Sequence, residues 1–218
     1  MATVLAYYDV PAVQREELIG SARESGTQAG WWSRPLPGVL PDVGTLASYE
    51  ASASRITDWS LAVVPGLLQT KSYAAGIMTG DGITAQDVEM RWIARQRRQR
   101  VLPNVEYMAF IHESALRRPF GGAEALKEQL QHLVAAPDRG LGVRIVREHL
   151  PHNLLLHSWM LLHFPEVADV LHVELWGSSL YLHDSEVDGY AKMREMLDRQ
   201  ALSSVESRSM IGRLLERL

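Results

Sequence analysis

The 218-residue sequence contains no cysteine, which excludes disulfide bonds, thiolate metal sites and a cysteine nucleophile. It also has no excess of positive charge, because 22 lysines and arginines face 26 aspartates and glutamates, giving a net charge of -4. A domain that wraps duplex DNA usually needs a basic excess, so any nucleic-acid contact must be local. No apolar run has membrane-spanning length, and the first twenty residues do not resemble a signal peptide. We therefore expect a cytoplasmic protein that makes no membrane contact.

Motifs that identify common enzyme classes are missing as well. The sequence has no glycine-rich phosphate loop, no nucleophile elbow and no dinucleotide fingerprint. Its eight histidines lack the ligand spacing of a zinc site, which leads us to expect no metal and no cofactor. These absences argue against an enzymatic function.

The apolar periodicity changes along the chain. Helical spacing predicts helices over residues 13–24, 46–59, 84–102, 122–133, 187–200 and 205–218, with Thr84 and Ser203 or Ser204 as caps. Short apolar runs predict strands over residues 105–111, 142–147, 158–163, 169–175 and 178–183. We predict an α+β fold in which residues 1–104 form a helical lobe and residues 105–218 an α+β lobe, packed as one body. The second lobe is expected to hold a small, mainly antiparallel sheet of about four strands flanked by helices.

An arginine-rich helix is the strongest charge feature of the sequence. Arg91, Arg95, Arg98 and Arg100 recur within RWIARQRRQR, and arginines at helical spacing can hold phosphates or an acidic protein partner. A solvated face whose arginines pair with nearby carboxylates is the plainer interpretation, and the one that we favour.

Glu113 and Arg117 follow a predicted strand, where catalytic groups often lie. Glu113 could act as a general base while Arg117 fixes an anion. The same spacing also allows a structural ion pair across one helical turn, and we favour that alternative because no second catalytic element accompanies the pair.

Six tryptophans suggest a pocket for a modest apolar or aromatic ligand, although aromatic residues also make ordinary cores. The tryptophans near the VPGLLQT segment (64–70) motivate a cavity lined by some of the following residues: Trp31, Trp32, Trp59, Leu67, Leu68, Tyr73 and Trp92.

One motif resembles a known family. WSLAVVPGLLQTKSYAAGIM (59–78) resembles the signature of actinobacterial regulators in which a helix-turn-helix of the xenobiotic-response type precedes a domain of unknown function. Further matching segments follow the family's order, namely REELIGSARESGTQAGWW (15–32), RWIARQRRQRVL (91–102), HESALRRPFGG (112–122) and AKMREMLDRQALSSVESRSMI (191–211).

The resemblance implies the ligand- or partner-sensing effector domain of a transcriptional regulator, similar to the WhiJ group and to antitoxin-like regulators. Such relatives often have a small partner protein, and they carry DNA-binding helices ahead of the segment that matches YYDV (7–10). We therefore expect a small protein partner or a small-molecule ligand, and no direct duplex DNA binding by this chain alone. The alternative is a stand-alone enzyme that uses an aminoacyl-tRNA or another nucleic-acid-linked substrate, which would bind RNA.

Overall fold

The computed structural model describes residues 11, 38–39, 41–80, 82–147 and 156–218. The predicted helix over residues 13–24 and the tryptophans Trp31 and Trp32 lie outside these residues. None of the helices in the described ranges combines the length and the apolar character needed to cross a bilayer.

Helices and strands are distributed over the whole described part of the chain. The helices are α3 (Pro41–Ser52), α4 (Lys71–Gly80), α5 (Ala85–Gln99), α6 (Ala123–Val134), α7 (Asp188–Gln200) and α8 (Ser204–Leu215). Short 3-10 turns are η2 (Gly66–Leu68), η3 (Leu102–Asn104), η4 (Glu113–Arg117), η5 (Pro137–Arg139) and η7 (Asp184–Glu186). The strands are β1 (Arg55–Ser60), β2 (Glu106–His112), β3 (Gly142–Val146), β4 (Trp159–His163), β5 (Val170–Leu175) and β6 (Ser178–Leu182). The predicted α+β class is confirmed, and each of the five predicted strands is present.

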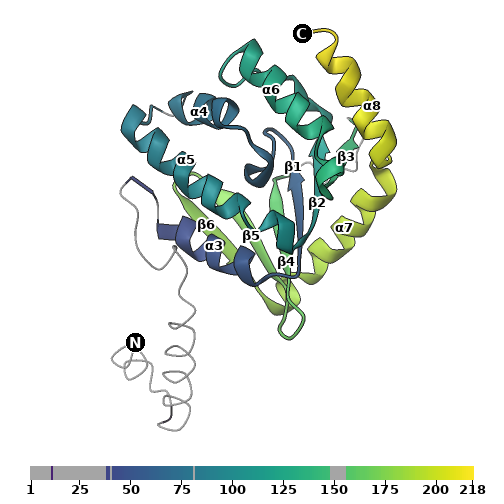
Figure 1. Cartoon of the computed structure of the whole chain (residues 1–218). Coiled ribbons are helices and arrows are strands. Elements are labelled where there is room, and N and C mark those ends of the chain that lie inside the picture. The colour runs from purple at the N-terminus through teal and green to yellow at the C-terminus, as the bar shows by residue number, and fades with distance from the viewer. Residues whose placement is uncertain (1–10, 12–37, 40, 81, 148–155) are drawn as a thin grey trace. The chain divides into compact units, whose positions relative to one another are not determined.

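The strands form one six-stranded mixed sheet in the order β3-β2-β1-β4-β5-β6 (Figure 1). The two pairings of β2, with β1 and with β3, are parallel. The pairings of β4 with β1, of β4 with β5 and of β5 with β6 are antiparallel. Strand β1 lies before residue 104 in the sequence, whereas its neighbours β2 and β4 lie after residue 104. A single sheet therefore includes described residues from both predicted lobes.

The prediction of one helix over residues 46–59 is wrong in its second half. Helix α3 ends at Ser52, and β1 begins at Arg55. Backbone hydrogen bonds redirect the chain here: Ser54 donates its N–H to the His163 carbonyl (2.9 Å) and accepts from the Glu106 N–H (3.0 Å). The central sheet position therefore overrides the helical spacing that continues from α3.

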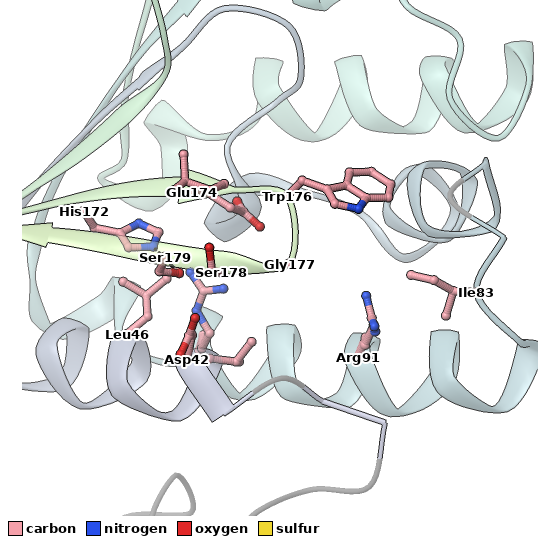
Figure 2. Close-up of a pocket in the computed structure, with 13 residues that line it drawn as sticks. Asp42, Leu46, Ile83, Arg91, His172, Glu174, Trp176, Gly177, Ser178 and Ser179 are labelled. Atoms are coloured by element: carbon pink, nitrogen blue, oxygen red, sulfur yellow. Dashed lines mark hydrogen bonds between the residues drawn. The ribbon is translucent and has the colours of Figure 1, made fainter.

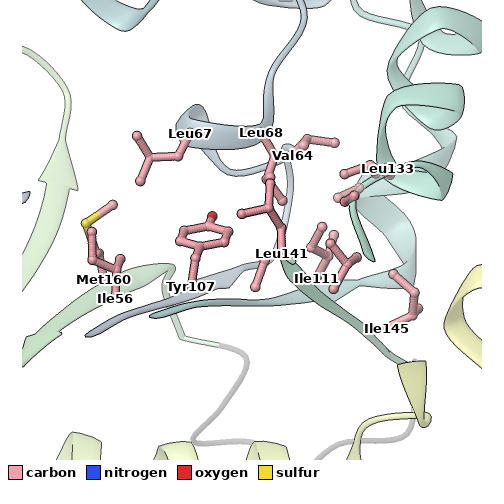
Figure 3. Close-up of a cluster of buried hydrophobic side chains, with 14 of the residues drawn as sticks. Ile56, Val64, Leu67, Leu68, Tyr107, Ile111, Leu133, Leu141, Ile145 and Met160 are labelled. Carbon is pink, nitrogen blue, oxygen red and sulfur yellow. The ribbon is translucent and has the colours of Figure 1, made fainter. Parts of the chain in front are cut away.

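Apolar side chains pack on both faces of the sheet. On one face, β-strand residues such as Ile56 and Tyr107 join Leu67 and Leu68 of η2, together with residues of α3, α6 and α8. Figure 3 shows this core between the sheet and the turn that carries Leu67 and Leu68. On the other face, Trp59 and its strand neighbours pack against α7.

Helix α5 begins at the predicted cap, where the Thr84 side chain accepts from the Asp87 N–H.

Candidate ligand-binding cleft

A cleft opens on the sheet face that α3 and α5 cover. It has an inner hollow of about 290 Å³ over β1, β4 and β5, and an outer hollow of about 310 Å³ beside the turn between β5 and β6. The two hollows share lining residues, which are Leu46, Arg98, His172, Glu174 and Leu175. We treat them as one site, called here the cleft.

The outer hollow contains an exposed aromatic side chain. Trp176, 84% exposed, is at the β5–β6 turn, followed by Gly177 with φ of 79°. In Figure 2, Trp176, Arg91 and Ile83 lie around one end of this hollow, while His172, Ser179 and Leu46 lie at the other. The tight turn positions the indole at the mouth of the cleft, because a left-handed φ is readily adopted by glycine.

The inner hollow has a carboxyl group on its floor. Asp58 of β1 is 7% exposed, and the Tyr107 hydroxyl of the neighbouring strand donates to its Oδ2 (2.6 Å). Burial is the main cause that raises the pKa of Asp58 to about 7, although the Tyr107 hydrogen bond opposes it. A carboxyl group with this pKa can hold or release a proton near neutral pH.

Glu50 of α3 and Arg98 of α5 form a buried ion pair at the edge of the cleft. The Arg98 Nε and Nη2 donate to the two carboxylate oxygens at 2.8 and 2.6 Å. The side chains are 1% and 10% exposed. Despite desolvation, the charge of Glu50 and its hydrogen bond keep the pKa of Arg98 above the usual value. This bidentate pair ties the two covering helices together.

Arg95, one helical turn before Arg98, has no such partner. Its Nη1 donates to Oε1 of Gln69 (2.5 Å), an uncharged acceptor. Its Nε is shielded from solvent and has no hydrogen-bond partner among the described residues. No carboxylate in the described ranges lies within ion-pair distance of Arg95. Desolvation lowers the pKa of Arg95 to about 10, so the guanidinium stays charged at neutral pH.

Gln69 is itself fixed in place. Its side-chain amide N–H donates to the Val64 carbonyl (2.7 Å), and the backbone carbonyl of Gln69 accepts from the Gln99 side chain (2.8 Å). Arg95 is thereby positioned in the inner hollow with donor capacity to spare.

His172 of β5 lines both hollows as an uncharged group. It is 5% exposed, and its Nε2 is 3.1 Å from the Ser179 Oγ. Desolvation, supported by the charge of Arg98, lowers the pKa of His172 to about 4. At neutral pH the ring therefore serves as a hydrogen-bonding group and carries no positive charge.

A model of the family described as "Domain of unknown function (DUF5753)" matches residues 43–213. The chain belongs to this family. No curated protein and no solved structure gives a match. The cleft therefore lies entirely within a DUF5753 domain, apart from Asp42 at its rim.

Of the residues proposed from the sequence to line a pocket, Trp31 and Trp32 lie outside the described residues, and the other five are dispersed in this DUF5753 domain. Trp59 is among the residues around the inner hollow, but its indole packs in the core on the opposite face of the sheet. Leu67, Leu68 and Tyr73 are fully buried in the main core, and Trp92 packs against a small cluster formed by α4 and α5. The hydrophobic part of the predicted pocket is thus mostly core.

The four candidate arginines separate by position. Arg91 lines the outer hollow, Arg95 the inner one, and Arg98 both. Arg100, at the C-cap of α5, is exposed. Our preference for a solvated arginine face is wrong for Arg98, because Glu50 from a helix nearly fifty residues earlier holds it inside the protein.

Glu113 and Arg117 lie away from the cleft, on η4. Their carboxylate and guanidinium are 3.8 Å apart across one turn, which agrees with the structural alternative. Both line a groove against α8 that also contains Arg147, Arg213 and Arg217.

The sequence-based candidates did not include Asp58 or Glu174, and His172 was considered only as one of the eight histidines, which lack the ligand spacing of a zinc site. Asp58 was hidden by the wrong helix assignment, and the other two are on a strand without a local motif. The available signal was RITDWS itself, where the adjacent β-branched residues Ile56 and Thr57 and the aromatic Trp59 flank a carboxylate and favour a strand.

Proposed function

We propose that this chain is the small-molecule-sensing effector domain of a transcriptional regulator, and that its ligand binds in the cleft. The observation that carries the proposal is Arg95, a half-buried arginine whose Nε is shielded from solvent and which lines the cleft without a carboxylate partner among the described residues. Buried charges in proteins are normally paired. A ligand that supplies the missing polar partner would remove this desolvation cost. The relief of that cost would contribute to the free energy of ligand binding.

The regulator context comes from the resemblance of the VPGLLQT segment to actinobacterial regulators of the xenobiotic-response type. This segment contributes directly to the cleft: Pro65, Gly66 and Gln69 line the inner hollow. Leu67 and Leu68 anchor the same turn in the core. A segment that both anchors the fold and holds Arg95 could transmit ligand binding to the rest of a regulator.

The test is to purify the chain from its native host, denature it and identify released small molecules by mass spectrometry. We expect a molecule to be released from the wild type and to be depleted from Arg95→Gln. The matched control is Arg199→Gln, an exposed arginine substitution on α7, which covers the opposite face of the sheet.

The identified molecule should also stabilise the purified protein. At about 100 times its Kd, a ligand adds roughly 2.7 kcal/mol, which corresponds to a Tm increase of about 5–10 °C for a chain of this size. The increase should be lost in Arg95→Gln and kept in Arg199→Gln. Equal ligand-induced shifts in all three proteins, or no released molecule at all, would contradict the proposal.

A further inference from the structure

Two groups of opposite charge type line the inner hollow without pairing with each other. Arg95 and Asp58 both lie there, yet no ion pair within 4.0 Å joins them, and neither has another ion-pair partner among the described residues. In the same cleft, Glu50 and Arg98 do pair bidentately. Two carboxyl groups of the inner hollow, the buried Asp58 and the exposed Glu174, therefore have no ion pair among the described residues, and neither has the Arg95 guanidinium.

Uncharged neighbours hold these two groups in place. Gln69 accepts one hydrogen bond from Arg95, and Tyr107 donates one to Asp58. Each anchor uses one polar atom of its partner and neutralises no charge. The remaining guanidinium N–H groups can still bind an anion, and the carboxylate can still bind a cation.

We infer that the cleft binds a small zwitterion that carries an ammonium and a carboxylate, of which the free α-amino acids are the simplest class. The ligand carboxylate would bind the Arg95 guanidinium, and its ammonium would bind Asp58. This inference rests on the proposed function and narrows it to one ligand chemistry. Leu46 and Met160 in the lining leave apolar surface for a ligand side chain.

Ammonium binding requires the ionised form of Asp58, so affinity should rise with pH. The groups that surround Asp58 are Glu50 from α3, Arg95 and Arg98 from α5, Tyr107 from β2, His157 ahead of β4, and His172 and Glu174 from β5. Burial and the two glutamates disfavour ionisation of Asp58, while Arg98 and Tyr107 favour it, and the resulting pKa is about 7. We expect affinity for an amino acid to increase about tenfold per pH unit below this value, and to level off above it.

The experiment uses the full chain and a defined set of probes. The twenty L-amino acids, β-alanine and 4-aminobutyrate are screened by thermal shift, and the best ligand is titrated by calorimetry at pH 6, 7 and 8. Three analogues of that ligand separate the two contacts: its methyl ester and its decarboxylated amine lack the carboxylate, and its deaminated acid lacks the ammonium.

Wild type should bind the amino acid roughly 10- to 100-fold more tightly than each analogue, because each lacks one charge-assisted contact. Arg95→Gln should lose the preference over the ester and the amine while keeping the preference over the acid. Asp58→Asn should show the reverse pattern and lose the pH dependence. Arg199→Gln should behave as the wild type.

Other results would overturn the inference. If the deaminated acid or the methyl ester binds as tightly as the amino acid, one of the two contacts does not exist. If none of the probes binds while binding of the molecule from the native host still depends on Arg95, the assignment of a zwitterionic ligand is wrong and the proposed function stands. If neither the probes nor a host molecule binds in an Arg95-dependent way, both fail.

Discussion

At the scale of single residues, the ionisable groups of the cleft differ in the kind of partner that each one has. Arg98 has a carboxylate partner, Arg95 has an amide, and Asp58 has a phenol. A paired arginine, Arg98, and an arginine without an ion pair, Arg95, therefore lie one turn apart on α5. The ion pair of Arg98 has a structural role. The uncharged partners of Arg95 and Asp58 leave a desolvation cost that folding alone does not recover.

That cost makes a prediction for Asp58→Asn. The unfolded chain releases the Asp58 proton near pH 3.8, whereas the folded protein retains it up to about pH 7. Between these values the folded state binds more protons, so the contribution of Asp58 to stability falls as pH rises, and becomes constant above about 7. Asparagine cannot ionise, and its carbonyl can still accept from Tyr107. We expect Asp58→Asn to exceed the wild type in stability by about 2–4 kcal/mol at pH 8 and by much less at pH 5.

Urea denaturation at pH 5, 6, 7 and 8 measures this difference. His172 has the opposite effect, because its lowered pKa makes the folded protein gain stability as pH rises from about 4 to 6.5. This contribution is present in both proteins and cancels in the comparison. Parallel stability curves for the wild type and Asp58→Asn would show that the Asp58 pKa is close to normal.

At the scale of secondary structure elements, the sequence predicted most of the fold. All five strands after residue 104 lie where the short apolar runs predict them, and Thr84 caps α5 as expected. The exception is β1, the strand between the parallel and antiparallel parts of the sheet. Its residues follow the helical spacing of α3 without a proline or glycine, so a local pattern could not separate the two elements.

The candidate site was predicted only in part, for a related reason. The arginines of α5 were visible because they are consecutive in the sequence. Asp58 and His172 are more than a hundred residues apart, and they approach each other only because β4 pairs with both β1 and β5. Pairing between distant strands leaves no mark in either segment alone.

Helix α4 offers a test of close packing between elements. A Cβ added to Gly76 would collide with the backbone of Gly121 and Phe120, whereas a Cβ at Gly80 in the same helix would meet no atom within 4 Å. We expect Gly76→Ala to destabilise the protein by about 3 kcal/mol, since backbone cannot move aside as a flexible side chain can. Gly80→Ala should be neutral or stabilising by up to about 1 kcal/mol, because alanine favours the helix. Equal effects in urea denaturation would rule out this contact.

At the scale of the whole molecule, the orientation of the arginines decides what the protein can bind. The chain has a net charge of -4, and Arg95 and Arg98 face the cleft. A helix that tracked phosphates would instead present its arginines to solvent. The distribution of positive charge is therefore more suitable for a small ligand in the cleft than for a nucleic acid along α5.

This distribution yields a prediction about RNA, the substrate of the alternative enzyme function. Each phosphate contact on a single strand changes the slope of log K against log salt concentration by about 0.7. With Arg95 and Arg98 turned inward, Arg91 and Arg100 supply few contacts, so we expect no affinity for bulk tRNA tighter than about 1 μM. Filter binding at 50 and 200 mM salt measures the affinity for tRNA and its salt dependence. The Arg91→Gln, Arg100→Gln double variant is the comparison. That variant should bind tRNA as weakly as the wild type. A sub-micromolar wild-type affinity that falls steeply with salt and is lost in the double variant would favour the enzyme over the sensor, because the phosphate contacts would then lie on the outer surface of α5.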